Sequence, residues 1–250
     1  MYPVLFTIAN FDLRASYVFL FLGILIGILV GYKEAKRVGI SKFDFHLYWI
    51  SAIPIALFLA KVNGYVFRIR LGNIPGQLED ILSYGLVSYG AILGMLLLGY
   101  FLTKIRKTNT ALFLDTVSLT MPLILVIYRI GCLLNGCCHG LETDSFLGIT
   151  LPSGLGVLVK RYPTQIWLIL LNFFLFAWLW SIRKKKLFDG LLAIYFLILY
   201  CLGRLFVDAF RDLQRVFGPF SFHQLLAITI LLTTLYAYLE IWLSRRSVVE

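Results

Sequence analysis

The chain has 250 residues, of which 60% are hydrophobic and only 14% are charged. Soluble domains are usually about half apolar and about a quarter charged, so this composition argues against a soluble protein and indicates a membrane protein. The formal net charge of +10 also occurs in nucleic-acid-binding proteins, but the positions of the basic residues argue against that class.

Seven apolar windows follow one another along the chain, and each is long enough to cross a bilayer, which takes about 20 mostly apolar residues. The sequence contains no internal repeat and no phosphate-binding or dinucleotide-binding fingerprint. We therefore predict an all-α, polytopic membrane bundle of seven transmembrane helices in a single domain, residues 1–250. The windows are approximately 15–32, 47–66, 86–103, 112–134, 164–182, 188–206 and 220–243.

Basic residues cluster just beyond alternate windows, at 33–42, 104–107, 183–186 and 245–246. Short segments rich in Lys and Arg stay in the cytoplasm. We therefore predict that the N-terminus lies outside the cell and the C-terminus in the cytoplasm. Because the positive charge follows this topology, no nucleic-acid partner is predicted. The three connections on the outer side are then 67–85, 135–163 and 207–221, and functional groups often concentrate on such loops.

Charged residues at membrane depth are the most informative, because placing one there costs at least about 2.5–3.5 kcal/mol. Arg129 lies in the outward end of the fourth window and Arg204 in that of the sixth. Asp208 and Arg211 follow Arg204 at helical spacing and share one face with it, as does Tyr200. Two arginines on different helices could grip a phosphate with paired hydrogen bonds. The alternative is a structural ion-pair cluster, or arginines that extend to the interface.

Glycines surround Arg129 in the sequence. Gly131, Gly136 and Gly140 are expected to loosen the helix end and expose backbone N–H groups to an anion. Asn135 could add an amide hydrogen bond to a lipid head group. Tyr89, at the start of the third window, could bond a substrate, although tyrosines at this depth are commonly interfacial anchors.

Cysteines are concentrated in the same stretch, at Cys132, Cys137 and Cys138, with His139 beside them. The spacing is not a standard zinc pattern, and adjacent cysteines rarely both bind one tetrahedral ion. No metal site is predicted, and small packing residues are the favoured interpretation. His223 is interpreted in the same way, as a histidine satisfied at the membrane interface.

Several short motifs, in order along nearly the whole chain, carry a family resemblance. The chain resembles the prolipoprotein diacylglyceryl transferases, bacterial membrane enzymes that begin lipoprotein maturation. The motifs are Pro3-Val4-Leu5-Phe6 leading to Tyr17, a Ser-Tyr-Gly entry to the third window, Arg129 to Gly136 with Gly140, Arg161-Tyr162-Pro163-Thr164-Gln165, Gly190 to Arg211, and Ser221 to Gln224.

The resemblance implies an inner-membrane enzyme that transfers diacylglycerol from phosphatidylglycerol to the thiol of a lipobox cysteine in prolipoproteins, without a cofactor. It implies Arg129, Arg204 and Tyr89 as catalytic residues. The alternatives are a related lipid transferase with another acceptor and a non-catalytic lipid or small-molecule transporter. Expected substrate-binding residues are Tyr17, Asn135, Gly140, Gln165, Tyr200, Asp208, Arg211 and Gln224.

The chain departs from the family pattern at several positions. Tyr89 stands where the family has the histidine of His-Gly-Gly, which has been proposed to assist catalysis. Cys132 replaces an asparagine, Cys137 and Leu168 replace acidic residues, and Asp208 replaces a glutamate. These changes leave both arginines in place but alter the expected base and the peptide-binding residues.

Overall fold

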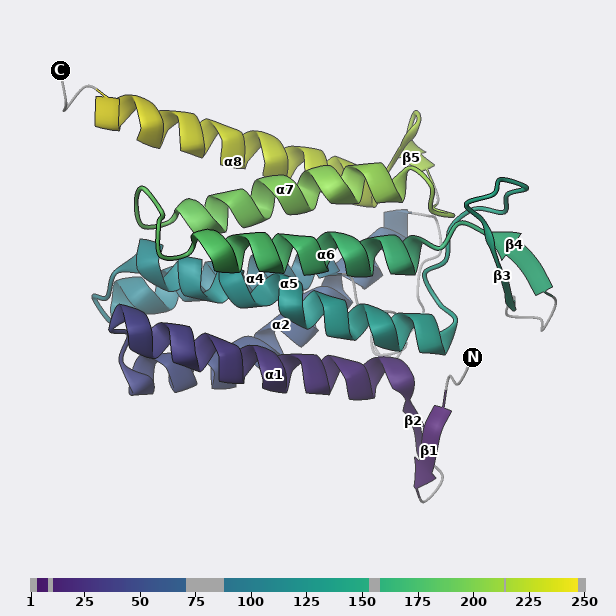
Figure 1. Ribbon diagram of the computed structural model, residues 1–250, viewed down its shortest axis with the longest axis horizontal. Coiled ribbons are helices and arrows are strands. Elements are labelled where there is room, and N and C mark those ends of the chain that lie inside the picture. The colour runs from purple at the N-terminus through teal and green to yellow at the C-terminus, as the bar shows by residue number, and fades with distance from the viewer. Residues whose placement is uncertain (1–3, 9–10, 71–87, 153–157, 214, 247–250) are drawn as a thin grey trace.

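The computed structural model describes residues 4–8, 11–70, 88–152, 158–213 and 215–246. Seven helices in these ranges form a bundle (Figure 1), and each predicted window lies on one of them, which confirms the helical bundle. Of the predicted outer connections, residues 71–85, 153–157 and 214 lie outside the described residues. The helices are α1 (Ala15–Val38), α2 (Lys42–Arg70), α4 (Ser88–Ile105), α5 (Thr110–Asn135), α6 (Thr164–Ile182), α7 (Leu191–Asp208) and α8 (Phe222–Arg246).

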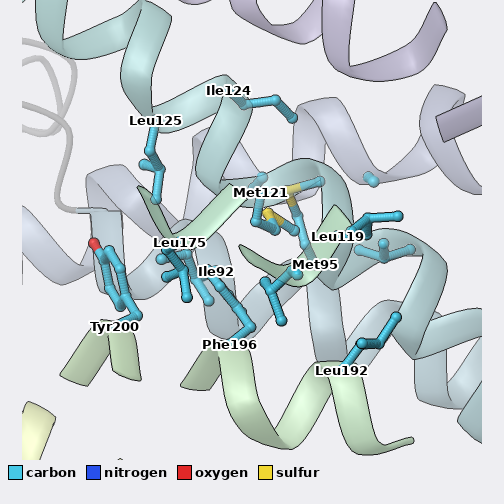
Figure 2. Packing of buried hydrophobic residues seen from close by; sticks show 14 of the residues in the cluster. Ile92, Met95, Leu119, Met121, Ile124, Leu125, Leu175, Leu192, Phe196 and Tyr200 are labelled. Atoms are coloured by element: carbon cyan, nitrogen blue, oxygen red, sulfur yellow. The ribbon is translucent and has the colours of Figure 1, made fainter. Parts of the chain in front are cut away.

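Six of these helices are long and apolar enough to cross a membrane: α1, α2, α5, α6, α7 and α8. The apolar part of α4, Tyr89–Ile105, is shorter. Helix α5 is the central one, since 61% of its apolar window is buried, against 17% to 50% in the other five. It packs against α1, α4, α6 and α7. Figure 2 shows Met121 of α5, Leu175 of α6 and Phe196 of α7 converging in the core.

Small residues set the distance between α1 and α5. Gly23, Gly27 and Gly31 repeat every fourth residue and line one face of α1. A Cβ atom added at Gly27 would lie 2.5 Å from Cγ1 of Ile124, so no larger residue fits there. This close approach of backbones is the usual role of small residues between membrane helices.

Three antiparallel β-hairpins, which an all-α prediction does not include, lie at the same end of the bundle (Figure 1). Here the chain leaves the apolar windows and pairs its backbone polar groups locally. In the third hairpin Gly218 adopts a positive φ of 54° in the turn. The strands are β1 (Val4–Ile8), β2 (Phe11–Arg14), β3 (Ile149–Pro152), β4 (Leu158–Arg161), β5 (Arg215–Phe217) and β6 (Phe220–Ser221).

The basic connections gather at the opposite end, where buried carboxylates hold them. Arg106 Nε lies 2.7 Å from Asp44 Oδ1. Lys186 Nζ lies 2.6 Å from Asp115 Oδ2. Asp115 also accepts hydrogen bonds from the backbone N–H groups of residues 190 and 193, at 2.9 and 3.0 Å. The carboxylate thereby satisfies N–H groups at the start of α7 that have no partner within the helix.

Candidate active site

Two buried arginines approach each other from α5 and α7, at the hairpin end of the bundle. Arg129 is 5% exposed and Arg204 is 1% exposed. The positive charge of Arg129 acts directly on Arg204, which places the two guanidinium groups in one electrostatic environment. Tyr200, on the α7 turn before Arg204, lies near both arginines.

The two arginines differ in how they are compensated. Arg204 donates from Nη2 to Asp208 Oδ2 at 3.0 Å, while its buried Nε and Nη1 atoms have no partner among the described residues. Arg129 has no carboxylate within ion-pair distance in the described part of the chain, and its Nη1 atom makes only a long contact of 3.9 Å to Cys132 Sγ. A buried charge needs a partner, so the cluster has capacity for an anion.

Asp208 connects the two arginines of α7 and its C-terminal turn. Its side chain is fully buried, and its Oδ1 atom accepts a hydrogen bond from Arg211 Nη1 at 3.2 Å. The predicted sharing of one face by Arg204, Asp208 and Arg211 is therefore confirmed. The carboxylate fixes both guanidinium groups through opposite oxygens, so it positions them as well as neutralising part of their charge.

Aromatic rings cover Arg204 on the side of α4 and α8. Its guanidinium carbon lies 5.4 Å from the centre of the Tyr89 ring. The Tyr89 ring in turn lies 6.0 Å from Tyr200 and 6.4 Å from His223. The Tyr89 hydroxyl is buried without a partner among the described residues. Sequence reasoning assigned His223 to the interface, since nothing in the sequence pairs α8 with α4.

The turn after α5 is ordered by its own backbone and by α6. Gly136 ends the helix in the left-handed conformation, with φ of 71°. Its N–H group and that of Cys137 both donate to α5 carbonyls. Gln165, at the start of α6, is fully buried and donates from Nε2 to the Cys137 carbonyl at 2.9 Å. The expected exposure of these N–H groups to an anion is therefore wrong, because the helix cap uses them. Asn135, the last residue of α5, is half-buried here.

Gly131 likewise does not loosen the helix. It lies within α5, where an added Cβ atom would be 2.9 Å from the backbone oxygen of Ala15. Its absent side chain permits close contact with the start of α1, so this part of the sequence interpretation is also wrong.

Gly140 joins two of the predicted outer loops. Its N–H group donates to the Tyr162 carbonyl at 2.9 Å, and it forms an isolated β-bridge with Arg211. An added Cβ atom would lie 2.7 Å from the backbone oxygens of both Tyr162 and Phe210. The contact positions the segment carrying Arg211, which explains how a residue far from α7 in sequence bears on the arginine cluster.

Three thiols complete the environment of Arg129. Hydrogen bonds with the thiols of Cys132 and Cys137 hold the pKa of the Cys138 thiol well below its ordinary value. The positive charges of Arg129 and Arg211 act in the same direction. Cys138 thus has the electropositive surroundings that favour a thiolate.

Two pockets of different character lie beside the cluster. The first is almost entirely apolar and is lined by residues of α1, α2, α4 and α5, including Trp49, Met95 and Tyr128. Tyr128 immediately precedes Arg129. The second is lined by Asp208, Arg211 and other residues of the third hairpin region. The apolar pocket thus includes the residue next to Arg129, and the polar pocket includes the two residues, Asp208 and Arg211, that are bound to each other beside Arg204.

Comparisons with known proteins match nearly the whole chain. The family model for prolipoprotein diacylglyceryl transferase matches residues 3–240. The chain belongs to this family. The phosphatidylglycerol–prolipoprotein diacylglyceryl transferase of Clostridioides difficile (strain 630) is 32% identical over 226 residues, covering 90% of this chain and 89% of that protein. The enzyme of the same name from Bacillus mycoides (strain KBAB4) is 30% identical over 223 residues, covering 85% and 82%.

Two residues expected from the family resemblance make no hydrogen bond with Arg129 or Arg204 among the described residues. Tyr17, on α1, has a half-exposed side chain. Gln224 accepts from the Ser221 N–H group at 2.9 Å, and its own N–H donates to Ser221 Oγ at 3.3 Å. This reciprocal pair is a capping box, so Gln224 begins α8 while also lining the polar pocket. Of the other expected residues, Tyr200, Asp208 and Arg211 lie beside Arg204. Gly140 contacts the segment that carries Arg211, and Gln165 holds the turn after α5.

The sequence did not predict a second cluster of polar side chains, formed by His139, Glu142 and Arg161. Arg161, in β4, lies 2.6 Å from Glu142 through Nη2 and 3.0 Å from His139 Nδ1 through Nη1. The bridge between Glu142 and Arg161 continues the backbone contacts made by Gly140. Only pairing of distant loop segments brings these three together, and no spacing in the sequence indicates that pairing.

Replacing Gly140 with alanine is expected to lower the thermal unfolding midpoint by several degrees, because the new Cβ atom meets two backbone oxygens that cannot rotate away. Overpacking of this kind costs about 1–3 kcal/mol. The matched control is Gly99→Ala in α4, where the nearest atom would be a movable side-chain carbon of Leu114 at 3.2 Å. Equal midpoints for the two variants, measured in the same detergent, would contradict the structural role of Gly140.

Proposed function

We propose that this protein transfers the diacylglyceryl group of phosphatidylglycerol to the thiol of a prolipoprotein cysteine. The observation that carries the proposal is the pair of buried guanidinium groups on α5 and α7. Among the described residues, Arg204 has two buried donors without a partner and Arg129 has no carboxylate partner. Guanidinium binds phosphate with two parallel hydrogen bonds. The names of the relatives supply the substrate class and the reaction.

The two pockets suit the two ends of such a substrate. With the lipid phosphate between Arg129 and Arg204, its acyl chains occupy the apolar pocket that reaches Tyr128. The polar pocket beside Asp208 and Arg211 then receives the lipobox segment of the acceptor protein. Irregular backbone at the hairpin end lines a cavity, as backbone near membrane depth must.

The acceptor thiol attacks the glycerol carbon that bears the phosphate. A carbon–sulfur bond forms as the carbon–oxygen bond to phosphate breaks, and glycerol phosphate leaves carrying the proton that the thiol lost. Negative charge accumulates on the leaving phosphate in the transition state. Arginines held in place in a site with little water stabilise that charge without further rearrangement. The residues Tyr17, Asn135, Gly140, Gln165, Tyr200 and Gln224 are assigned to binding or shaping the substrate site.

The proposal includes an orientation of the protein in the membrane. All seven helices cross the inner membrane of a bacterial cell, with the three hairpins and the arginine cluster on the outer side. The basic connections and the C-terminus lie in the cytoplasm, in accordance with the positive-inside rule. The arrangement is supported by the gathering of hairpins at one end and basic segments at the other (Figure 1).

The test mixes purified protein, phosphatidylglycerol vesicles and a synthetic lipobox peptide, followed by mass spectrometry of the peptide. We expect a mass gain of one diacylglycerol on the cysteine, which is lost with Arg129→Ala. If protein that is folded and binds phosphatidylglycerol adds no mass to the peptide, the proposed acceptor is wrong. It would favour a related transferase acting on another thiol or hydroxyl group, since the departures at Tyr89, Cys132 and Cys137 all lie beside the arginines.

Tyr89 is assigned a catalytic role through a hydrogen bond from its hydroxyl to the substrate. We expect Tyr89→Phe to lower the transfer rate about 10-fold, the effect of one hydrogen bond of about 1.4 kcal/mol. Tyr48→Phe is the matched control, because Tyr48 is an equally buried tyrosine whose hydroxyl donates to the Met95 carbonyl at 3.1 Å, away from the arginines. Initial rates at saturating lipid distinguish the two variants. An unchanged rate in Tyr89→Phe would remove Tyr89 from the catalytic residues.

A further inference from the structure

The chain brings three cysteine side chains together at the end of α5. Cys132 lies in the last turns of the helix, and Cys137 and Cys138 follow it. The left-handed conformation of Gly136 reverses the chain, and Cys138 itself has a positive φ of 64°. As a result, the three Sγ atoms all lie within 4.8 Å of one another. The sequence spacing did not predict this convergence, because it depends on the turn.

No other histidine, cysteine or carboxylate among the described residues joins the three cysteines, but the positive charge of Arg129 lies beside them. Arg129 Nη1 lies 3.9 Å from Cys132 Sγ, and no carboxylate pairs with Arg129 within the described ranges. The adjacent histidine, His139, is engaged through Nδ1 with Arg161 at 3.0 Å. A fourth ligand for a tetrahedral zinc site is therefore not offered by the neighbouring side chains that the structure describes. The buried Arg129 instead compensates part of the net negative charge that three thiolates and a monovalent ion would carry.

A disulfide is the main alternative use of three neighbouring thiols. All four cysteines are free in the structure. A bond between the adjacent residues Cys137 and Cys138 would be strained, because disulfides favour Cα atoms about 5.5–6 Å apart. A bond from Cys132 to either neighbour would leave the third sulfur without a role. The arrangement of three sulfurs around a common point fits a metal ion better than it fits one bond.

We propose that Cys132, Cys137 and Cys138 form a binding site for one soft, thiophilic metal ion, with Cu(I) as the representative. Thiolate ligands select soft ions such as Cu(I). With metal–sulfur bonds of about 2.3 Å, as for zinc thiolates, three sulfurs in a plane around the ion lie about 4 Å apart. The sulfurs therefore need to move by less than about 1 Å to bind. The site lies beside Arg129, but the proposal does not rest on the transfer reaction, because metal binding is measured without lipid or peptide.

The experiment titrates Cu(I) into reduced, detergent-purified protein under anaerobic conditions, in competition with a chromophoric Cu(I) chelator. We expect one equivalent to bind with sulfur-to-copper absorption in the ultraviolet and only sulfur neighbours in the X-ray absorption spectrum. Cys137→Ser and Cys138→Ser should each weaken binding by about 100-fold or more. Cys137 is the safer change, because its side chain is half-buried whereas Cys132 is fully buried.

Cys201→Ser on α7 is the control, since Cys201 lies outside the three-cysteine cluster, and we expect it to bind Cu(I) like the parent chain. Circular dichroism and size-exclusion chromatography show that each variant is folded. The proposal is overturned if protein with four titratable thiols binds no Cu(I), or if binding survives both Cys137→Ser and Cys138→Ser. It is also overturned if protein purified in air, with oxygen as the oxidant, holds a disulfide among the three cysteines, which would appear as two titratable thiols instead of four.

Discussion

Replacing either Arg129 or Arg204 with lysine is expected to lower the rate of diacylglyceryl transfer by about 100-fold or more. Lysine keeps the positive charge but presents a single ammonium group, which cannot make two parallel hydrogen bonds to phosphate. Removing one preorganised donor from a transition-state anion typically costs about 100- to 1000-fold in rate. The Arg204 atoms Nε and Nη1, which have no partner in the described structure, are the donors that the substitution removes.

The measurement is the initial rate of peptide lipidation, normalised to folded protein. Arg183→Lys is the matched control, because Arg183 is an arginine with a 17% exposed side chain in contact with aromatic and acidic side chains. Its guanidinium carbon lies 3.7 Å from the Trp180 ring and its Nε atom 3.5 Å from Glu34, at the basic end of the bundle. If Arg129→Lys and Arg204→Lys both transfer at near-normal rates, the phosphate clamp is wrong.

The helices and the arginine pair could be predicted from the sequence because both depend on local chemistry. Apolar stretches of bilayer length form helices wherever backbone groups cannot reach water, and α5 to α8 follow the predicted windows closely. Arg129 and Arg204 are conspicuous because few charges occur in such stretches. The shared face of Arg204, Asp208 and Arg211 follows from helical spacing alone.

The rest depends on contacts between distant segments. Nothing in the sequence shows that the loop at Gly140 pairs with the segment after α7, or that His223 of α8 reaches Tyr89 of α4. Gly131 and Gly136 look alike in sequence, but one is packed inside α5 and the other ends it. Their difference is set by the neighbouring helix α1, whose start lies against Gly131. Tertiary packing, more than local preference, decided each of these cases.

Asp208 is the residue on which the geometry of the clamp depends most. Its two carboxylate oxygens hold Arg204 and Arg211 at 3.0 and 3.2 Å. Without its charge, three buried or partly buried guanidinium groups would face one another with no carboxylate between them. Breaking a buried ion pair by removing one partner typically costs about 3–5 kcal/mol. The loss affects both stability and the orientation of Arg204.

We therefore expect Asp208→Asn to lower both the unfolding midpoint and the turnover number, the latter by at least about 10-fold. Binding of phosphatidylglycerol should weaken less than turnover, because removing a negative charge leaves the site more attractive to an anion. The matched control is Asp115→Asn, which removes an equally buried carboxylate from its 2.6 Å contact with Lys186 at the basic end. We expect that variant to lose stability while its folded fraction keeps the normal turnover number. Equal losses of turnover in both variants would mean that Asp208 acts through stability alone, whereas a loss confined to Asp208→Asn identifies it as the residue that positions Arg204 for phosphate.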